Sequence, residues 1–408
     1  MSAETVEILV IGAGQAGLAA SEHLRAHGLS HLIVERARIA ERWRSERWDS
    51  LVANGPAWHD RFPTLTFDDI DPDAFAPRDR IVRYFETFAA QVEAPVRCGV
   101  EVTALKRRPD GGFVAQTSAG VIEASRVVVA TGPFQRPVIP DVVPAAAGVL
   151  QLHSSAYRNP AQLPKGGVLV VGAGASGSQI ADELQRAGRR VYLSVGPHDR
   201  PPRRYRGRDF VWWLGALGVW DARTPGPNAE HVTIAVSGAH GGHTVDFRAL
   251  GRQGVTLVGR AEGFENGRMR FASDLAATIA RGDAHYLSML DAADDYARRE
   301  RLDLPEEPEA RLFPPDPDCV REPATELDLA AAGITTILWA TGYTLDFGWL
   351  DVDVLDEKGR PVHERGVSKV PGLYFLGLSW LSRRASAFIW GVWHDARYVA
   401  GHIAAAGR

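Results

Sequence analysis

The apolar residues of this chain form the same pattern in two places. Residues 8–17 read ILVIGAGQAG and residues 168–177 read VLVVGAGASG, so that an unbroken apolar run leads each time into a glycine-rich turn. A short apolar run that ends at glycine is typical of a buried strand in a parallel sheet. Helical spacing follows from about 15 to 26 and from about 176 to 187, and a glycine closes each helix. The pattern predicts two strand–turn–helix units.

The rest of the chain alternates between the strand and helix periods. This alternation predicts an α/β fold built on parallel sheets, with a β-hairpin where PDGG joins VEVTALKRR to GFVAQTS. A segment rich in proline and alanine, 137–164, is expected to cross into a second domain. The further predicted strands are 31–35, 125–134, 190–194, 333–343 and 372–380, and the further predicted helices are 77–92, 273–300 and about 390–405.

The glycines of the two units match the spacing G-x-G-x-x-G of a dinucleotide site. The first glycine permits a tight turn, the second lets the backbone approach the pyrophosphate, and the third lets the helix pack on the strand. The helix N-terminus then faces the anion. Each motif follows a strand and opens a helix, which makes the signal strong. We therefore predict two Rossmann-like dinucleotide sites, on Gly12, Gly14 and Gly17 and on Gly172, Gly174 and Gly177.

The two predicted sites differ at the end of the second strand of each unit. Glu35 ends that strand in the first unit, where a carboxylate accepts hydrogen bonds from ribose and repels a 2′-phosphate, so FAD or NAD(H) is expected. Ser194 takes this place in the second unit, and Arg200, Arg203 and Arg204 follow. Arginines near a missing carboxylate suit a 2′-phosphate, which favours NADPH. A solvated basic loop is the alternative interpretation.

Composition and charge exclude several other classes of protein. The 408 residues carry a net charge of −4, which gives no global basic field for nucleic acid or a membrane surface. The richest apolar stretch, 210–220, is shorter than the roughly 18 residues of a membrane span. Cys98 and Cys319 lie far apart and form no metal or redox motif. We therefore expect no metal site. Because no leader precedes the first strand, we also expect a cytoplasmic protein.

With both glycine units in this order, the chain resembles the class B flavoprotein monooxygenases, the flavin-containing monooxygenase-like family. The resemblance is closest to the short bacterial type related to plant indole-pyruvate monooxygenases. It also rests on ERWRSERWDSL (41–51), LQLHSSAYRNP (150–160) and LWATGY (338–343). It implies an FAD-binding domain, 1–160 and 326–408, into which an NADPH-binding domain, 161–325, is inserted.

The family signature F-x-G-x-x-x-H-x-x-x-[YF]-[KR] is only half present. His153, Tyr157 and Arg158 match its second part, whereas Ala147 and Val149 replace the phenylalanine and the glycine. If this segment is helical, the histidine and the tyrosine share one face. We expect them to have a structural or hinge role between the domains.

The resemblance implies a reaction. NADPH reduces FAD, O2 adds at the flavin C4a position, and the resulting (hydro)peroxyflavin gives one oxygen atom to a small organic substrate such as an amine, a sulfide or an electron-rich aromatic ring. Asn54 lies near the place of the family's asparagine beside the reactive flavin carbon, which makes it the candidate catalytic residue. The residues expected to bind the cofactors are Gly12, Gly14, Gln15, Ala16, Gly17, Glu35, Arg36, Trp43, Arg44, Val102, Thr131, Gly172, Gly174, Ser176, Gly177, Arg203, Arg204 and Thr341.

Other activities compete with this one. A disulfide reductase needs a cysteine pair that the chain lacks, but an FAD-dependent NADPH reductase that transfers single electrons needs none. Baeyer–Villiger monooxygenases resemble the chain but have tryptophan at the place of Tyr157. A nucleotide sensor without catalysis is a third alternative. The segment 203–221 is predicted as an amphipathic lid helix or a homodimer contact, and His394 with Asp395 as a surface pair or a donor to the flavin. Walls that exclude water are expected from Trp43, Trp48, Trp58, Trp380, Trp390 and Trp393, whose alternative role is core packing.

Overall fold

The two glycine units lie in two separate sheets. The computed structural model describes residues 3–223 and 233–406. The first sheet has the strand order β21-β4-β5-β6-β1-β2-β3, with β24 attached to β6 and followed by β23 and β22. Its strands are β1 (Glu4–Ile11), β2 (His31–Glu35), β3 (Val96–Cys98), β4 (Val102–Arg107), β5 (Phe113–Thr117), β6 (Gly120–Val129), β21 (Leu350–Asp351), β22 (His363–Glu364), β23 (Val367–Ser368) and β24 (Leu373–Phe375).

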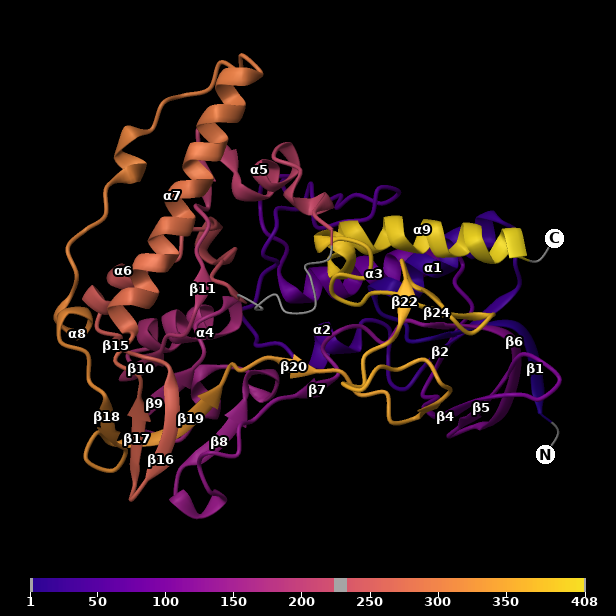
Figure 1. Cartoon of the computed structure of the whole chain (residues 1–408), viewed down its shortest axis with the longest axis horizontal. Helices are drawn as coiled ribbons and strands as arrows, with labels where there is room; N and C mark the ends of the chain where they lie inside the picture. Colours follow the sequence, from indigo (N-terminus) through magenta and orange to yellow (C-terminus); the bar gives the residue numbers. More distant parts are fainter. Residues whose placement is uncertain (1–2, 224–232, 407–408) are drawn as a thin grey trace.

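The centre of the first sheet is parallel and fully buried. β1 pairs in parallel with β2 and β6, and its residues Ile8, Leu9 and Val10 have no exposed surface. Burial on both faces explains why this strand reads as an unbroken apolar run. Helices lie beside this sheet in Figure 1, and the yellow C-terminal helix lies next to the N-terminal one. They are α1 (Gln15–Ala26), α3 (Arg78–Gln91) and α9 (Ile389–Ala406).

The second sheet forms the other end of the molecule in Figure 1. Its five strands run in the order β15-β10-β9-β19-β8, and every pair in it is parallel. A smaller antiparallel sheet, β16-β17-β18, adjoins it. The strands are β8 (Leu150–His153), β9 (Gly167–Val171), β10 (Val191–Ser194), β15 (Thr256–Val258), β16 (Ala261–Glu265), β17 (Arg268–Phe271), β18 (Glu326–Asp328) and β19 (Ile334–Trp339), and the helices are α4 (Ala175–Arg186), α6 (Phe247–Arg252), α7 (Leu275–Arg299) and α8 (Asp318–Arg321).

The sheets bear on the predicted domain limits. β8 and β19 fall outside the range 161–325, yet both pair within the second sheet. The chain passes between the two ends through β7 (Arg136–Pro137) and β20 (Tyr343–Thr344), which pair with each other and lie between the sheets in Figure 1. We therefore propose that the inserted domain begins near residue 138 and ends near residue 343.

Most predicted elements are present, with local differences. The helices predicted over 77–92, 273–300 and about 390–405 are confirmed as α3, α7 and α9, and the hairpin as β4 and β5. The segment with His153 and Tyr157 is not a helix, because β8 ends there and only a single turn follows. The side chains of both residues have structural partners, since His153 Nε2 lies 3.0 Å from the Gly342 carbonyl and Tyr157 donates to Glu183 at 2.7 Å.

The predicted lid helix over 203–221 is correct only in its middle. Arg206 and Gly207 both have positive φ, as a tight hairpin turn requires, so a hairpin of β12 (Arg204–Tyr205) and β13 (Arg208–Asp209) precedes α5 (Phe210–Ala216). The apolar side of α5 packs inward, and Trp213 is 1% exposed. Among the described residues, no helix is long and apolar enough to span a bilayer.

The third glycine of each motif is where helix and turn meet. A Cβ atom at Gly17 would overlap the carbonyl oxygen of Gly12, and one at Gly177 would overlap that of Gly172. The first glycines have φ values of 108° and 104°, which side-chain-bearing residues rarely adopt. A Cβ at Gly14, by contrast, would meet no atom within 4 Å. The motif therefore divides into glycines that packing requires and a glycine that leaves space open.

This division predicts the stability of two alanine variants. Gly17→Ala should lower the free energy of unfolding by about 1–3 kcal/mol, because the added methyl group forces α1 away from the turn. Gly14→Ala should change it by less than about 0.5 kcal/mol. Urea unfolding followed by circular dichroism measures both. Equal effects of the two substitutions would show that the packing argument is wrong.

Candidate functional site

One cavity of about 2470 Å³ is lined by both glycine turns. Gly12 and Gly14 contribute from the first sheet, and Gly172 and Gly174 from the second. Pockets for small ligands commonly measure roughly 300–1,000 Å³. The cavity therefore has room for two dinucleotides, and each would meet its own turn.

The two helices that follow the glycine turns have open N-termini. α1 begins after Gly14 and α4 after Gly174, and within the described chain neither has a side chain that caps it. The first amide groups of a helix lack partners inside the helix, and together with its dipole they attract anions. Glycine at the cap also leaves space for a ligand to approach the backbone. These features fit the pyrophosphate group of a dinucleotide at each turn.

Glu35 is held in place beside the first turn. Its carboxylate accepts hydrogen bonds from the backbone amides of Ala13 at 2.9 Å and Ala37 at 3.0 Å, one to each oxygen. The side chain lines the cavity together with Arg36, which directly follows β2, and Val102, the first residue of β4. This arrangement puts a fixed carboxylate where the ribose of a bound dinucleotide is expected.

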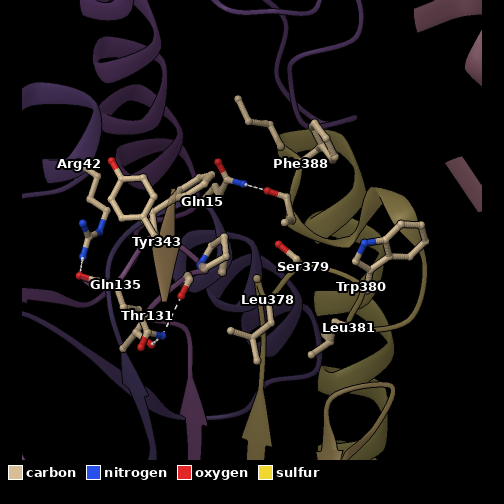
Figure 2. Close-up of a pocket in the computed structure, with 18 of the residues that line it drawn as sticks. Gln15, Arg42, Thr131, Gln135, Tyr343, Leu378, Ser379, Trp380, Leu381 and Phe388 are labelled. Atoms are coloured by element: carbon tan, nitrogen blue, oxygen red, sulfur yellow. Dashed lines mark hydrogen bonds between the residues drawn. The ribbon is translucent and has the colours of Figure 1, made fainter. Parts of the chain in front are cut away.

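A chain of hydrogen bonds joins the turn after β6 to the short helix α2 (Glu41–Ser45). Gln135 donates to the hydroxyl of Thr131 at 3.0 Å, and the Gln135 carbonyl accepts from Arg42 at 3.2 Å. Figure 2 also shows Gln15, whose amide donates to the carbonyl of Ala387 at 2.7 Å just before α9. The hydrogen bond of Gln15 therefore links the start of α1 to the residues before α9, and Gln15 and Ala387 both line the cavity.

Asn54 is fixed by residues of the second half of the site. Its Oδ1 accepts from Gln179 of α4 at 2.9 Å, and its backbone carbonyl accepts from Arg203 at 2.8 Å. Because Oδ1 is engaged, the amide NH2 group is what Asn54 can offer to a ligand in the cavity. The candidate catalytic residue is therefore a positioned donor.

Most of the residues expected from the sequence do line the cavity. They come from segments more than 300 residues apart, and what each binds stays a prediction. Gly17 and Gly177 lie behind the turns, where they serve packing. The lining residues among those expected are Gly12, Gly14, Gln15, Ala16, Glu35, Arg36, Trp43, Asn54, Val102, Thr131, Gly172, Gly174, Ser176 and Thr341.

Three expected arginines lie elsewhere. Arg44 donates to the Ile39 carbonyl at 3.0 Å and pairs with Glu86, so it turns away from the cavity that its neighbour Trp43 lines. Arg204 is exposed on the β12 hairpin, outside the cavity lining.

Arg203 differs most from its expected role. It is 3% exposed, its guanidinium binds both carboxylate oxygens of Asp209 at 2.5 and 2.6 Å, and it lies over the rings of Phe75 and Phe210. Burial lowers its pKa below the ordinary value, which the paired aspartate opposes. Arg200 is likewise buried and binds Asp283 at 2.6 Å. The expectation that Arg203 faces a phosphate is therefore not met, because its charge is already neutralised inside the protein.

Several residues that line the cavity were not predicted from the sequence to belong to the site. Sequence spacing gives no sign of Gln179 or Gln135, because neither belongs to a motif. The dipeptide His59-Asp60 lies within residues 41–63, an aromatic stretch that contains Trp43, Trp48 and Trp58, and this is the one local signal near it. The cavity-lining residues missed in this way include His59, Asp60, Gln135, Gln179, Trp220 and Arg384.

Comparison with known proteins places the chain among flavoproteins. Residues 9–205 match the family described as pyridine nucleotide-disulphide oxidoreductase. Over 402 aligned residues, 98% of each chain, the sequence is 34% identical to an uncharacterized CzcO-like oxidoreductase of Geobacillus kaustophilus.

Two further relatives are monooxygenases. Over 46% of this chain and 47% of the relative, the sequence is 33% identical to indole-3-pyruvate monooxygenase YUCCA1 of rice, Oryza sativa. The flavin-containing monooxygenase of Stenotrophomonas maltophilia superimposes with a TM-score of 0.68 over 99% of this chain and 100% of its own, at 20% identity. The chain belongs to the class B flavin monooxygenase-like proteins. The resemblance predicted from the sequence is thereby confirmed.

As a member of the class B flavin monooxygenase-like proteins, the chain shares its fold with enzymes of different activity. The bacillithiol disulfide reductase Bdr of Staphylococcus aureus superimposes with a TM-score of 0.65 at 14% identity, over 99% of this chain and 100% of that one. Likeness at this level shows the fold alone. The structural neighbours confirm the predicted mixed α/β fold with Rossmann-like domains. The matching family and the Geobacillus relative indicate that the chain is an oxidoreductase.

The buried pair of Arg203 and Asp209 gives a test of its structural role. Arg203→Ala should lower the free energy of unfolding by about 3–5 kcal/mol, because it leaves the largely buried carboxylate of Asp209 without its counter-ion and with only the Val211 amide as a donor. Arg204→Ala, on the neighbouring exposed residue, is the control and should change it by less than about 0.5 kcal/mol. Urea unfolding measures both variants. An Arg203→Ala protein as stable as the control would mean that Arg203 is not committed to the fold.

Proposed function

We propose that this protein is an FAD-dependent monooxygenase that uses NADPH and inserts one atom of O2 into a small organic substrate. The observation that carries the proposal is the single cavity onto which two uncapped helices open. Two dinucleotides bound there would bring their redox-active rings into one compartment. When bound, FAD would supply two-electron chemistry toward a nicotinamide and, once reduced, reactivity toward O2.

The first turn suits FAD and the second suits the nicotinamide coenzyme. Gly12 and Gly14 would admit the pyrophosphate of FAD, and Glu35 would accept hydrogen bonds from its ribose. Gly174 and Ser176, at the start of α4, would hold the coenzyme phosphates. Of the three arginines that suggested a 2′-phosphate site, Arg200 and Arg203 are buried and only Arg204 is exposed. The preference for NADPH over NADH therefore rests on Arg204, which the 2′-phosphate would reach outside the cavity lining.

The chain's own residues would orient the reactants and exclude water. Asn54, held by Gln179, would donate a hydrogen bond toward the reacting centre. Trp43 and Trp220 line the cavity. Apolar walls of this kind would keep water away from the reduced flavin and so limit side reactions that compete with oxygen transfer. The proposed substrates are amines, sulfides or electron-rich aromatic compounds. A cytoplasmic location and a homodimer stay predictions.

The competing activity is electron transfer without oxygenation. A disulfide reductase is disfavoured, because within the described chain neither Cys98 nor Cys319 lines the cavity. A reductase that passes electrons to a protein or dye would use the same two sites. Baeyer–Villiger oxidation is the second alternative, and the cyclohexanone monooxygenase neighbour, with a TM-score of 0.58 at 16% identity, supports it only at the level of the fold.

Reduction by NADPH tests the proposal directly. The purified protein should be yellow, and anaerobic NADPH should bleach the flavin absorption, since both cofactors share the cavity. Gly14→Ala should fold but lose FAD, because its methyl group occupies the approach to the pyrophosphate. Absorption spectra before and after mixing measure both. A yellow protein that NADPH and NADH leave unbleached would contradict the proposal, and bleaching without any reaction of the reduced flavin with O2 would favour the electron carrier.

The choice of coenzyme depends on Arg204. Arg204→Ala should weaken NADPH binding about tenfold, because a hydrogen bond to a charged group is worth about 1.5 kcal/mol or more. NADH binding should not change. Titration of the FAD-loaded protein with each oxidised coenzyme gives the dissociation constants, and Arg204→Lys, which retains the charge, is the control. Equal changes for both coenzymes would remove the assignment of NADPH through this residue.

A further inference from the structure

A buried histidine forms part of the cavity wall. His59 is 7% exposed and belongs to the aromatic stretch 41–63. Its ring stacks on Trp220 with the centroids 5.3 Å apart and an interplanar angle of 19°. Trp58 meets it edge-on at 5.6 Å, and Trp390 of α9 lies at 5.8 Å. Indole rings from three parts of the chain therefore fix the plane of the imidazole.

A carboxylate fixes the orientation of this ring. His59 Nδ1 lies 2.8 Å from Asp60 Oδ1, while Asp60 Oδ2 accepts from the Gly55 amide at 2.9 Å. An ionised carboxylate only accepts hydrogen bonds, so Nδ1 is the nitrogen that carries the proton. In the neutral ring, Nε2 is then an acceptor. Glycine at position 55 leaves the carboxylate of Asp60 its place, because a Cβ atom there would collide with it.

The accepting nitrogen has no partner. Within the described residues, His59 Nε2 is buried and makes no hydrogen bond. A buried acceptor without a partner costs free energy, and such groups in native proteins call for an explanation. His198 Nε2 also lacks a partner there, but His198 lies outside the cavity lining, against Gly282 of α7. His59 lines the cavity, where a ligand can supply the missing donor, as do His394 and Asp395, whose Nε2 and Oδ2 atoms also lack partners there.

The neighbouring lining is aromatic and apolar. Trp220, which stacks on His59, contacts Phe388 at 5.1 Å between ring centroids, and both line the cavity. Phe388 is 42% exposed, which is unusual for a large apolar side chain next to a buried cluster. Val236 and Leu214 belong to the same apolar cluster as Trp220 and also line the cavity. A flat apolar ligand would cover these surfaces.

We propose that His59, oriented by Asp60, accepts a proton from the substrate, and that the substrate is an aromatic compound with a phenolic O–H group. This inference rests on the proposed function and deepens it by naming the class of substrate. The O–H proton passes to Nε2, the bonding pair stays on the substrate oxygen, and Asp60 stabilises the imidazolium that forms. No oxidant takes part in this step. The phenolate is a stronger nucleophile than the phenol toward an electrophilic oxygen atom.

Binding of phenol and anisole tests the proposal without any turnover. The two probes differ only in that a methyl group replaces the acidic hydrogen. The FAD-loaded wild-type protein, titrated calorimetrically with each probe, should bind phenol about fivefold more tightly, the value of one ordinary hydrogen bond. His59→Phe keeps a flat ring but removes the acceptor, so it should bind the two probes equally. His59→Gln, which retains an acceptor oxygen, should keep part of the preference.

Asp60→Asn is the second variant. Its one amide oxygen would have to accept from both the Gly55 amide and His59 Nδ1, so the proton would no longer be fixed on Nδ1. Its preference for phenol should fall below that of the wild type. A wild-type protein that binds phenol no better than anisole, or binds neither probe, would overturn the proposal, as would a full preference in His59→Phe. Because these titrations need no reduction of the flavin, their failure is distinguishable from a failure of NADPH to bleach it.

Discussion

The close approach of each helix to its glycine turn is the constraint on which the site depends. The third glycine of each motif lets the helix touch the turn, so that the helix begins at the carboxyl edge of its sheet with its amide groups uncovered. No side chain of the described chain caps these amides. An anion is therefore the natural partner of each helix, and the two helices open onto the same cavity. Glu35, Asn54 and the aromatic residues of the site line this same cavity.

Polar contacts across the cavity connect the two halves. Asn54 comes from the loops near the first sheet, but Gln179 and Arg203, both beyond β9, hold it. His153 and Gly342 are bonded at the passage between the sheets. Residues that would face the reacting rings are therefore held by hydrogen bonds to the other half of the molecule, as Asn54 is by Gln179 and Arg203. Positions set by both halves favour a preformed site over one assembled by a ligand.

The sequence was informative where the structure depends on neighbours along the chain. The glycine spacing, the apolar strands and Glu35 are local signals, and each predicted the element or cavity position that the structure contains. Arg203 shows the limit of such reasoning, because its charge suggested a phosphate while Asp209, six residues away, already neutralises it. The cluster of His59 with Trp220 and Trp390 joins segments more than 150 residues apart, and no periodicity connects them. The domain limits could not be predicted from the sequence, because they depend on which strands pair. β8 and β19 lie outside the range 161–325 but pair within the second sheet.

The central claim is that the two helices serve one compartment for two nucleotides. A crystal structure of the protein with FAD and NADP+ tests this claim most directly. The account predicts one pyrophosphate at the turn of Gly14 and another at the turn of Gly174, with the isoalloxazine and the nicotinamide both inside the cavity between them. A nicotinamide nucleotide bound outside this cavity, or a second turn that stays empty at saturating NADP+, would contradict it.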